Sequence, residues 1–215
     1  MLKKQILLIV LFMLSPVIVA STYQLNYSIE IENDENASST CTITTENVNK
    51  VINCVGTKNT ETLKLKNNKL IEWINYFSPK TYFNAKHVDN NIILTGKNKD
   101  KEIYKEYKLS NTPWVQSPSL LLTEFILSNK KEIEFVMATG PMFSKMIIKK
   151  ENQETVTINN KTYESIKIKM SPPGLLGKLW KASIWYDAKN GNMIKYEAPN
   201  GPPGSKKLIM KIQET

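Results

Sequence analysis

Apolar and polar residues alternate along most of this sequence. From Tyr23 to Ile31 every odd position is apolar and every even position is polar, which is typical of a β-strand with one buried face. Turn-forming asparagine, aspartate and glycine residues separate many such segments. Besides a hairpin around residues 41–54, the alternation predicts strands at Tyr23–Ile31, Thr62–Lys66, Leu70–Phe77, Thr81–Lys86, Asn91–Leu94, Glu102–Leu109, Ile133–Met137, Lys145–Lys149, Thr155–Ile158, Tyr163–Met170, Ala182–Asp187, Met193–Glu197 and Lys207–Ile212.

Two cysteines, Cys41 and Cys54, bracket the early hairpin. With a two-residue turn at Asn47-Val48, residue numbers paired across the hairpin sum to 95, so the cysteines lie opposite each other. Pairs alternate between hydrogen-bonded and non-hydrogen-bonded positions outward from the turn. The cysteines fall at a non-hydrogen-bonded position, where β-carbons come closest and disulfide geometry can be met. We therefore predict a Cys41–Cys54 disulfide, with two free thiols as the alternative.

One apolar segment breaks the alternation. Ser117-Pro118 is a helix start signal, because proline suits the first helical position, and Asn129 followed by two lysines suits a helix end. Leu121 and Phe125 lie on a broad apolar face of this predicted helix. A helix this apolar needs cover on most sides, so we place it against or inside the curve of the sheet.

These elements predict a mainly β fold. The expected architecture is a strongly curved antiparallel sheet, a half-open β-barrel, wrapped around the mid-chain apolar helix; a two-sheet sandwich is the alternative. A short second helix is expected near Leu175–Trp180. No internal repeat or linker divides the sequence, so residues 21–215 are expected to form a single domain.

The first twenty residues differ from the rest. Lys3 and Lys4 precede an unbroken apolar run from Ile6 to Leu14, and a small residue, Ala20, follows. These are the parts of a secretory signal peptide. The fifteen positions from Ile6 to Ala20 fall short of the roughly 20 apolar residues of a membrane anchor, which is the competing interpretation. We expect cleavage near Ala20, no stable membrane span, and a periplasmic or secreted location.

The chain carries a formal net charge of +9. Its basic residues are all lysines, and they are spread along the sequence rather than gathered in one tract. Arginine, which makes bidentate contacts to guanine and phosphate, is absent. We therefore expect no nucleic-acid partner and assign the charge to a solvated surface, with weak attraction to an anionic envelope surface as the secondary interpretation.

Catalysis needs converging groups, and the sequence offers few. His87 is the only histidine, without local partners for a general-base or metal-ligand role. The predicted disulfide would occupy both cysteines, and no glycine-rich phosphate loop is present. We expect no catalytic residues, no metal and no cofactor, and predict that the protein is not an enzyme.

Two stretches resemble a known group of proteins. One is Trp114-x-x-x-Pro118-x-Leu120-Leu121, and the other is Ile184-Trp185-Tyr186-Asp187 followed by Gly191 and Ile194-Lys195-Tyr196. Together they are similar to uncharacterised periplasmic families allied to the outer-membrane lipoprotein carrier superfamily. The resemblance implies a half-open β-barrel covered by helices, with a hydrophobic cavity for acyl chains.

An apolar loop offers the main functional hint. The segment Pro172–Trp180 joins two predicted strands yet holds three leucines and a tryptophan, and large apolar residues in loops need a reason. Either this loop plugs one end of the sheet, or it forms a lip over a cavity. The lip interpretation predicts a site for a hydrophobic or lipid-like ligand, formed by Leu121, Phe125, Met142, Phe143, Leu175, Leu176 and Trp180. The alternative is an envelope interaction or scaffold protein with a solid core, whose partner is another envelope protein.

Overall fold

A computed structural model of the chain describes residues 20–213, and the predicted signal peptide lies almost entirely outside the described residues. The strands are β1 (Ser21–Ile31), β2 (Ala37–Glu46), β3 (Asn49–Gly56), β4 (Thr60–Lys66), β5 (Lys69–Ser78), β6 (Thr81–Val88), β7 (Asn91–Asn98), β8 (Lys101–Lys108), β9 (Glu132–Thr139), β10 (Met142–Ile158), β11 (Lys161–Ser171), β12 (Ala182–Asp187), β13 (Met193–Pro199) and β14 (Lys207–Gln213). The helices are α1 (Pro118–Leu121), α2 (Thr123–Leu127) and α3 (Leu176–Leu179).

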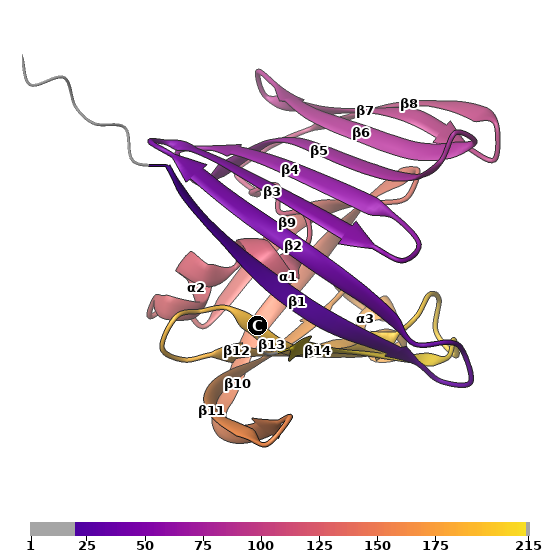
Figure 1. Ribbon diagram of the computed structural model, residues 1–215. Coiled ribbons are helices and arrows are strands. Elements are labelled where there is room, and N and C mark those ends of the chain that lie inside the picture. Colours follow the sequence, from indigo (N-terminus) through magenta and orange to yellow (C-terminus); the bar gives the residue numbers. More distant parts are fainter. Residues whose placement is uncertain (1–19, 214–215) are drawn as a thin grey trace, which may run out of the picture.

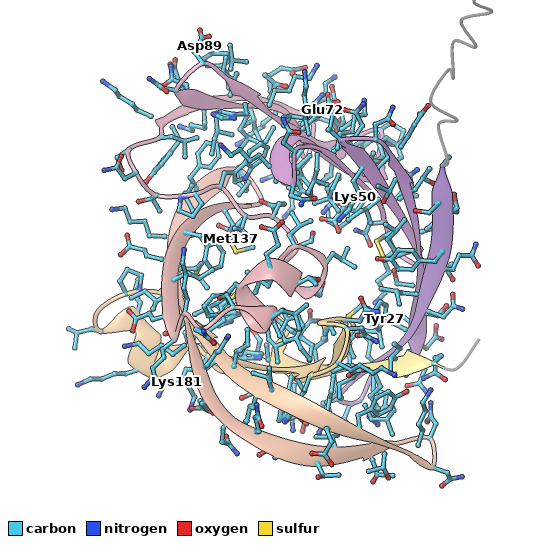
Figure 2. The ribbon with its side chains drawn as sticks, turned by 90° about the vertical axis from the view of Figure 1, so that its left-hand side faces the viewer. Tyr27, Lys50, Glu72, Asp89, Met137 and Lys181 are labelled. Atoms are coloured by element: carbon cyan, nitrogen blue, oxygen red, sulfur yellow. A yellow bond between two sulfur atoms is a disulfide. The ribbon has the colours of Figure 1, made fainter. Side chains whose placement is uncertain are left out.

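All the strands belong to one antiparallel sheet, in the order β8-β7-β6-β5-β4-β3-β2-β1-β14-β13-β12-β11-β10-β9. Strands that are neighbours in the sheet are also neighbours in sequence, except that β1 pairs with β14. The sheet is strongly curved and not closed. Figure 2 shows it as a nearly complete ring around α1 and α2, with Met137 on the inner side. The predicted fold class, a strongly curved antiparallel sheet around mid-chain helical residues, is therefore confirmed.

The inner face of the sheet and the helices share one hydrophobic core. Its fully buried members include Leu63 on β4, Ile92 on β7 and Ile148 on β10, and from the helical segment Leu122 and Ile126. Because successive side chains of a strand point to opposite faces, these strands bury one face each, as the alternation predicted. A smaller cluster, Ile158 with Trp185 and Ile194, lies separately from this core.

The sequence predicted one continuous helix after Ser117, and this prediction is wrong. The segment forms two short helices that break at Leu122, and Ser117 has a left-handed φ of 48° and makes no side-chain cap bond. Tertiary contacts account for the difference. The Ser117 hydroxyl donates to Glu61 on β4, and the Pro118 carbonyl accepts a 2.8 Å hydrogen bond from the buried Tyr186 hydroxyl. The predicted second helix near Leu175–Trp180 is confirmed as α3.

The two strands predicted at Lys145–Lys149 and Thr155–Ile158 are one strand, β10. Its pairing with β11 shifts between Lys150 and Gln153, where β10 carries one extra residue. Such a β-bulge reverses the phase of the alternation while pairing continues. The polar residues at the bulge therefore resemble a turn in the sequence although they lie within a strand.

The predicted disulfide and its hairpin register are confirmed. Cys41 and Cys54 are directly opposite in the β2–β3 pair, their α-carbons lie 4.0 Å apart, and they are bonded. The pairing continues to Glu46 and Asn49 beside the turn. Both cysteines are buried on the inner face of the sheet.

The two edge strands of the sheet, β8 and β9, do not pair with each other. The chain before α1 runs beside β9, where Val115 N–H donates to Val136 O (3.0 Å) and Val136 N–H donates to Pro113 O (2.9 Å). The Gln116 side chain continues this pattern with two 2.9 Å bonds to the backbone of Ala138. The connecting segment thus satisfies the free edge of β9, which would otherwise expose unpaired backbone groups.

None of the helices formed by residues 20–213 is both long and apolar enough to span a membrane.

Candidate ligand-binding groove

The helices α1 and α2 lie inside the sheet and leave a recess on either side. We call these sides the α3 end and the α2 end, and Figure 1 shows α2 and α3 at opposite ends of the sheet. Because the sheet is antiparallel, its connections alternate between the two ends. The α3 end carries β1–β2, β3–β4, β5–β6, β7–β8, β9–β10, β11–β12 and β13–β14, and the α2 end carries β2–β3, β4–β5, β6–β7, β10–β11 and β12–β13.

The recess at the α3 end is a groove of about 1050 Å³. Five of the chain's eight methionines line it. We call it the methionine groove and define it by the methionines and the apolar residues around them: Met137, Met142, Met146, Met170, Met210, Pro118, Pro172, Pro173, Leu176, Trp180, Tyr196, Pro202, Pro203 and Leu208. Polar lining residues are fewer and include Asn59, Glu61, Ser117 and Lys145.

The loop that bears α3 forms one lip of the groove. It turns back on the end of β11 at Gly177, where a β-carbon would lie 2.3 Å from the carbonyl oxygen of Pro172, so only glycine permits this approach. Trp180 follows, and its indole N–H donates to Gly201 O at 3.0 Å, which ties this loop to the β13–β14 connection. Leu176, which lines the groove, is 62% exposed, whereas Leu179 on the same helix is 64% exposed and does not line it.

One carboxyl group is placed among these apolar surfaces. Glu61 lies on β4 in phase with the buried Leu63 and Leu65, and therefore on the inner face. Its Oε1 accepts hydrogen bonds from Trp73 Nε1 (2.7 Å) and from Ser117 Oγ (2.5 Å). Burial among protein atoms raises the pKa of Glu61, although the two hydrogen bonds act in the opposite direction. The side chain is nevertheless not fully enclosed, because part of its surface opens into the groove.

The α2 end is more polar. Its recess, of about 680 Å³, has an apolar floor but a larger share of polar and charged lining residues than the groove: Asn68, Lys69, His87, Asp89, Asn90, Ser110, Asn111, Thr112, Glu124, Ser128 and Lys130. Asn68 Nδ2 donates to Glu124 Oε1 (2.6 Å), and Thr123 Oγ1 donates to Gly191 O (3.2 Å). These bonds join α2 to two hairpin turns.

A lysine completes the attachment of α2. Lys150 Nζ donates to Ile126 O (2.8 Å) and Ser128 O (2.5 Å), and it lies 4.9 Å from the centre of the Phe125 ring. A cation suits the carboxyl end of a helix, where carbonyl groups lack partners. Desolvation lowers the pKa of Lys150.

The seven predicted site residues do not lie in one place. Met142, Leu176 and Trp180 line the methionine groove together. Leu121 and Phe125 line the recess at the α2 end instead. Phe143 packs on Tyr107 of β8 at the junction of the sheet edges, with ring centres 5.3 Å apart, and Leu175 is 76% exposed and lines neither recess. Ligand binding by these residues remains a prediction.

Glu61 is not among the site residues predicted from the sequence. Its signal was the period of two, because Glu61 continues the phase of Leu63 and Leu65 and so belongs to the buried face of its strand. The groove methionines on β9, β10 and β11 were detectable in the same way. Their convergence depends on sheet curvature, which the alternation does not specify.

No cluster of histidine, cysteine, aspartate or glutamate within residues 20–213 has the arrangement of a metal site. His87 lies exposed near the end of β6, at the rim of the α2-end recess.

Comparison with known proteins finds a likeness among solved structures but no sequence family. No family model matches the chain, and no curated protein matches it. Among solved structures it is similar to the hypothetical lipoprotein YmcC from Escherichia coli K12, with 11% sequence identity and a TM-score of 0.43 over 90% of this chain and 84% of that one. At this TM-score the likeness carries no functional assignment.

Proposed function

We propose that this chain is an exported, non-enzymatic protein that binds a hydrophobic, chain-like ligand in the methionine groove. The observation that carries the proposal is the groove itself. It provides about 1050 Å³ of recess bordered by five methionines, five prolines, two leucines and one tryptophan. Small-molecule sites are concave, mostly apolar and typically about 300–1000 Å³ in volume.

The side chains of the groove suit a ligand without fixed shape. Methionine is unbranched and polarisable, so a surface built from it adapts to different apolar partners. Met142 and Leu176 are each 62% exposed at the mouth, and exposed apolar residues gathered at one recess are typical of binding sites. An alkyl or acyl chain laid along the groove would remove these surfaces from water.

The disulfide supports an extracytoplasmic location, because such bonds persist in oxidising compartments. Together with the leader-like sequence of residues 1–20, it underlies our proposal that the domain works in the periplasm or outside the cell. The partner in this proposal is a lipid or another apolar small molecule.

The experiment combines native mass spectrometry with a binding assay. Protein exported by a bacterial host should carry a co-purifying apolar molecule, and after its removal the protein should bind a fluorescent fatty-acid probe. Leu176→Ala should weaken probe binding, whereas Leu179→Ala should not, because these leucines share a helix and an exposure but only Leu176 lines the groove. Protein that is empty and also ignores the probe would contradict the proposal and favour the scaffold alternative.

A further inference from the structure

Glu61 occupies a place where a carboxyl group needs an explanation. It lies opposite Cys54 on one neighbouring strand and Asn75 on the other, in the inner row of the sheet. A carboxylate taken out of water is unfavourable unless it is paired. Among residues 20–213 no lysine forms an ion pair with Glu61, although the chain carries a net charge of +9. The two bonds to Glu61 come from neutral donors, Trp73 and Ser117.

Both of those donors use the same oxygen. Trp73 Nε1 and Ser117 Oγ bond to Oε1, and within the described residues no protein donor bonds to Oε2. Oε2 lacks a protein partner among these residues but is not fully enclosed, so it remains accessible. One oxygen is therefore fixed by the protein, and the other remains available to a molecule that enters from outside.

Two cavities meet at this carboxyl group. Glu61 lines the methionine groove and also a cavity of about 330 Å³ beside the disulfide, and Asn59, Ser119, Leu208 and Met210 are shared in the same way. A ligand chain lying along the methionines can thus bring one end to Glu61. The indole and hydroxyl donors hold the carboxyl group in place before any ligand arrives.

We propose that Glu61 is the head-group contact of the groove, and that the ligand is an amphiphile whose apolar chain ends in a protonated amine. This inference rests on the proposed function, because it names the ligand class of the same groove. An ammonium group supplies both the missing positive charge and a hydrogen-bond donor for Oε2. Charge-assisted bonds of this kind are roughly twice as strong as neutral ones.

The other head groups fit less well. A fatty acid or a phosphate monoester would place a second negative group beside Glu61, and like charges at short range repel. A fatty alcohol offers a donor but no charge. The lysines that line the two cavities already have ion-pair partners: Lys145 of the groove pairs with Glu134 at 3.7 Å, and Lys58 of the smaller cavity pairs with Asp34 at 3.5 Å.

The experiment measures the affinity of delipidated protein for dodecylamine, dodecanol, dodecanoic acid and dodecyltrimethylammonium by isothermal titration calorimetry at pH 7, with the weakest binding expected for dodecanoic acid. An alkylamine, like lysine, keeps its proton at this pH. Dodecylamine should bind about ten- to a hundred-fold more tightly than dodecanol, as expected for a hydrogen bond to a charged group. Dodecyltrimethylammonium, which has the charge but no N–H donor, should fall between them.

Two variants separate recognition from structure. Glu61→Gln keeps an oxygen that can accept from Trp73 and Ser117, so it should fold, yet it should lose the preference for the amine over dodecanol. Ser117→Ala removes one structural bond but keeps the carboxyl group, and should retain the preference. Equal affinities of the wild-type protein for dodecanol and dodecylamine would overturn the inference while leaving the proposed function standing. Absence of binding by all four probes would overturn both.

Discussion

The α2 end and the α3 end are built by the same sheet and flank the same helices, yet they differ in chemistry. At the α2 end, polar side chains join α2 to neighbouring turns, with Glu124 bound to Asn68 and Thr123 bound to Gly191. At the α3 end, methionines, prolines and leucines border the recess, and Leu176 remains largely exposed. The strands supply the curvature, and the loops and the side chains near the strand ends decide which recess can take an apolar ligand.

This contrast also separates two physical roles. Residues that hold the helices in place are expected to matter for stability, because their loss leaves cavities or unpaired groups inside the molecule. Residues that border the methionine groove are expected to matter for binding, because in the absence of ligand they already lie partly in water.

Truncation of the core at the α2 end should be the most damaging change. Ile126 is 1% exposed, so Ile126→Ala should lower the free energy of unfolding by about 2–5 kcal/mol through lost burial and a residual cavity. Leu176→Ala at the α3 end should change it by less than about 1 kcal/mol. Denaturant midpoints with unchanged slopes measure both. Similar large losses at both positions would show that the α3 loop is a plug of the core rather than a lip.

The disulfide should stabilise the wall beside the methionine groove. Replacing both Cys41 and Cys54 by serine should lower the free energy of unfolding by about 3 kcal/mol, because the bond closes a loop of about 14 residues in the unfolded chain. The change should be measured by the same denaturant titration, with reduced wild-type protein as the control. Two alkylatable thiols in undenatured exported protein would contradict the bond itself.

Lys150 tests how firmly α2 is attached. Lys150→Met keeps most of the side-chain volume but removes the donor to Ile126 O and Ser128 O, and should cost about 1.5–3 kcal/mol, as for hydrogen bonds to charged groups. The neighbouring Lys149 is exposed and paired with Glu132 at 2.8 Å, so Lys149→Met should cost about 0–1 kcal/mol. Thermal melts of the two variants provide the comparison. Equal costs would mean that the attachment adds nothing beyond a surface ion pair.

Replacement of Glu61 should change stability least, and at pH 7 it should raise stability rather than lower it. Burial raises its pKa in the folded protein, so the folded state binds the proton more tightly than the unfolded state does. Stability attributable to this group is therefore present below the unfolded pKa and is lost as pH rises through the folded pKa. Glu61→Gln should raise the denaturant midpoint relative to wild type at pH 7 and lose this advantage at pH 4. A midpoint difference that does not change with pH would contradict the prediction.

The sequence predicted the secondary-structure elements better than the contacts between elements that are distant in the chain. Alternation located the strands because each buries one face, and the Cys41–Cys54 register followed from counting along one hairpin. The bulge at Lys150 was not predicted, because an extra residue reverses the phase of the alternation while the strands remain paired. Phe143 was assigned to the binding site, yet it packs on Tyr107, from a strand far away in sequence. Contacts of that kind depend on sheet curvature, which a period of two does not encode.

The pairing of β1 with β14 has a consequence for the order of folding. Every other strand pair joins neighbours in the chain, whereas Gln213 reaches back to Ser28 over 185 positions. Non-local pairings of this length form slowly, since a long loop must close before any contact compensates for it. Strands β1–β8 and β9–β14 can each assemble hairpin by hairpin, but they join as one sheet only after β14 has been synthesised. Pulsed hydrogen exchange during refolding should therefore show the amides between β1 and β14 protected last, and early protection there would contradict this order.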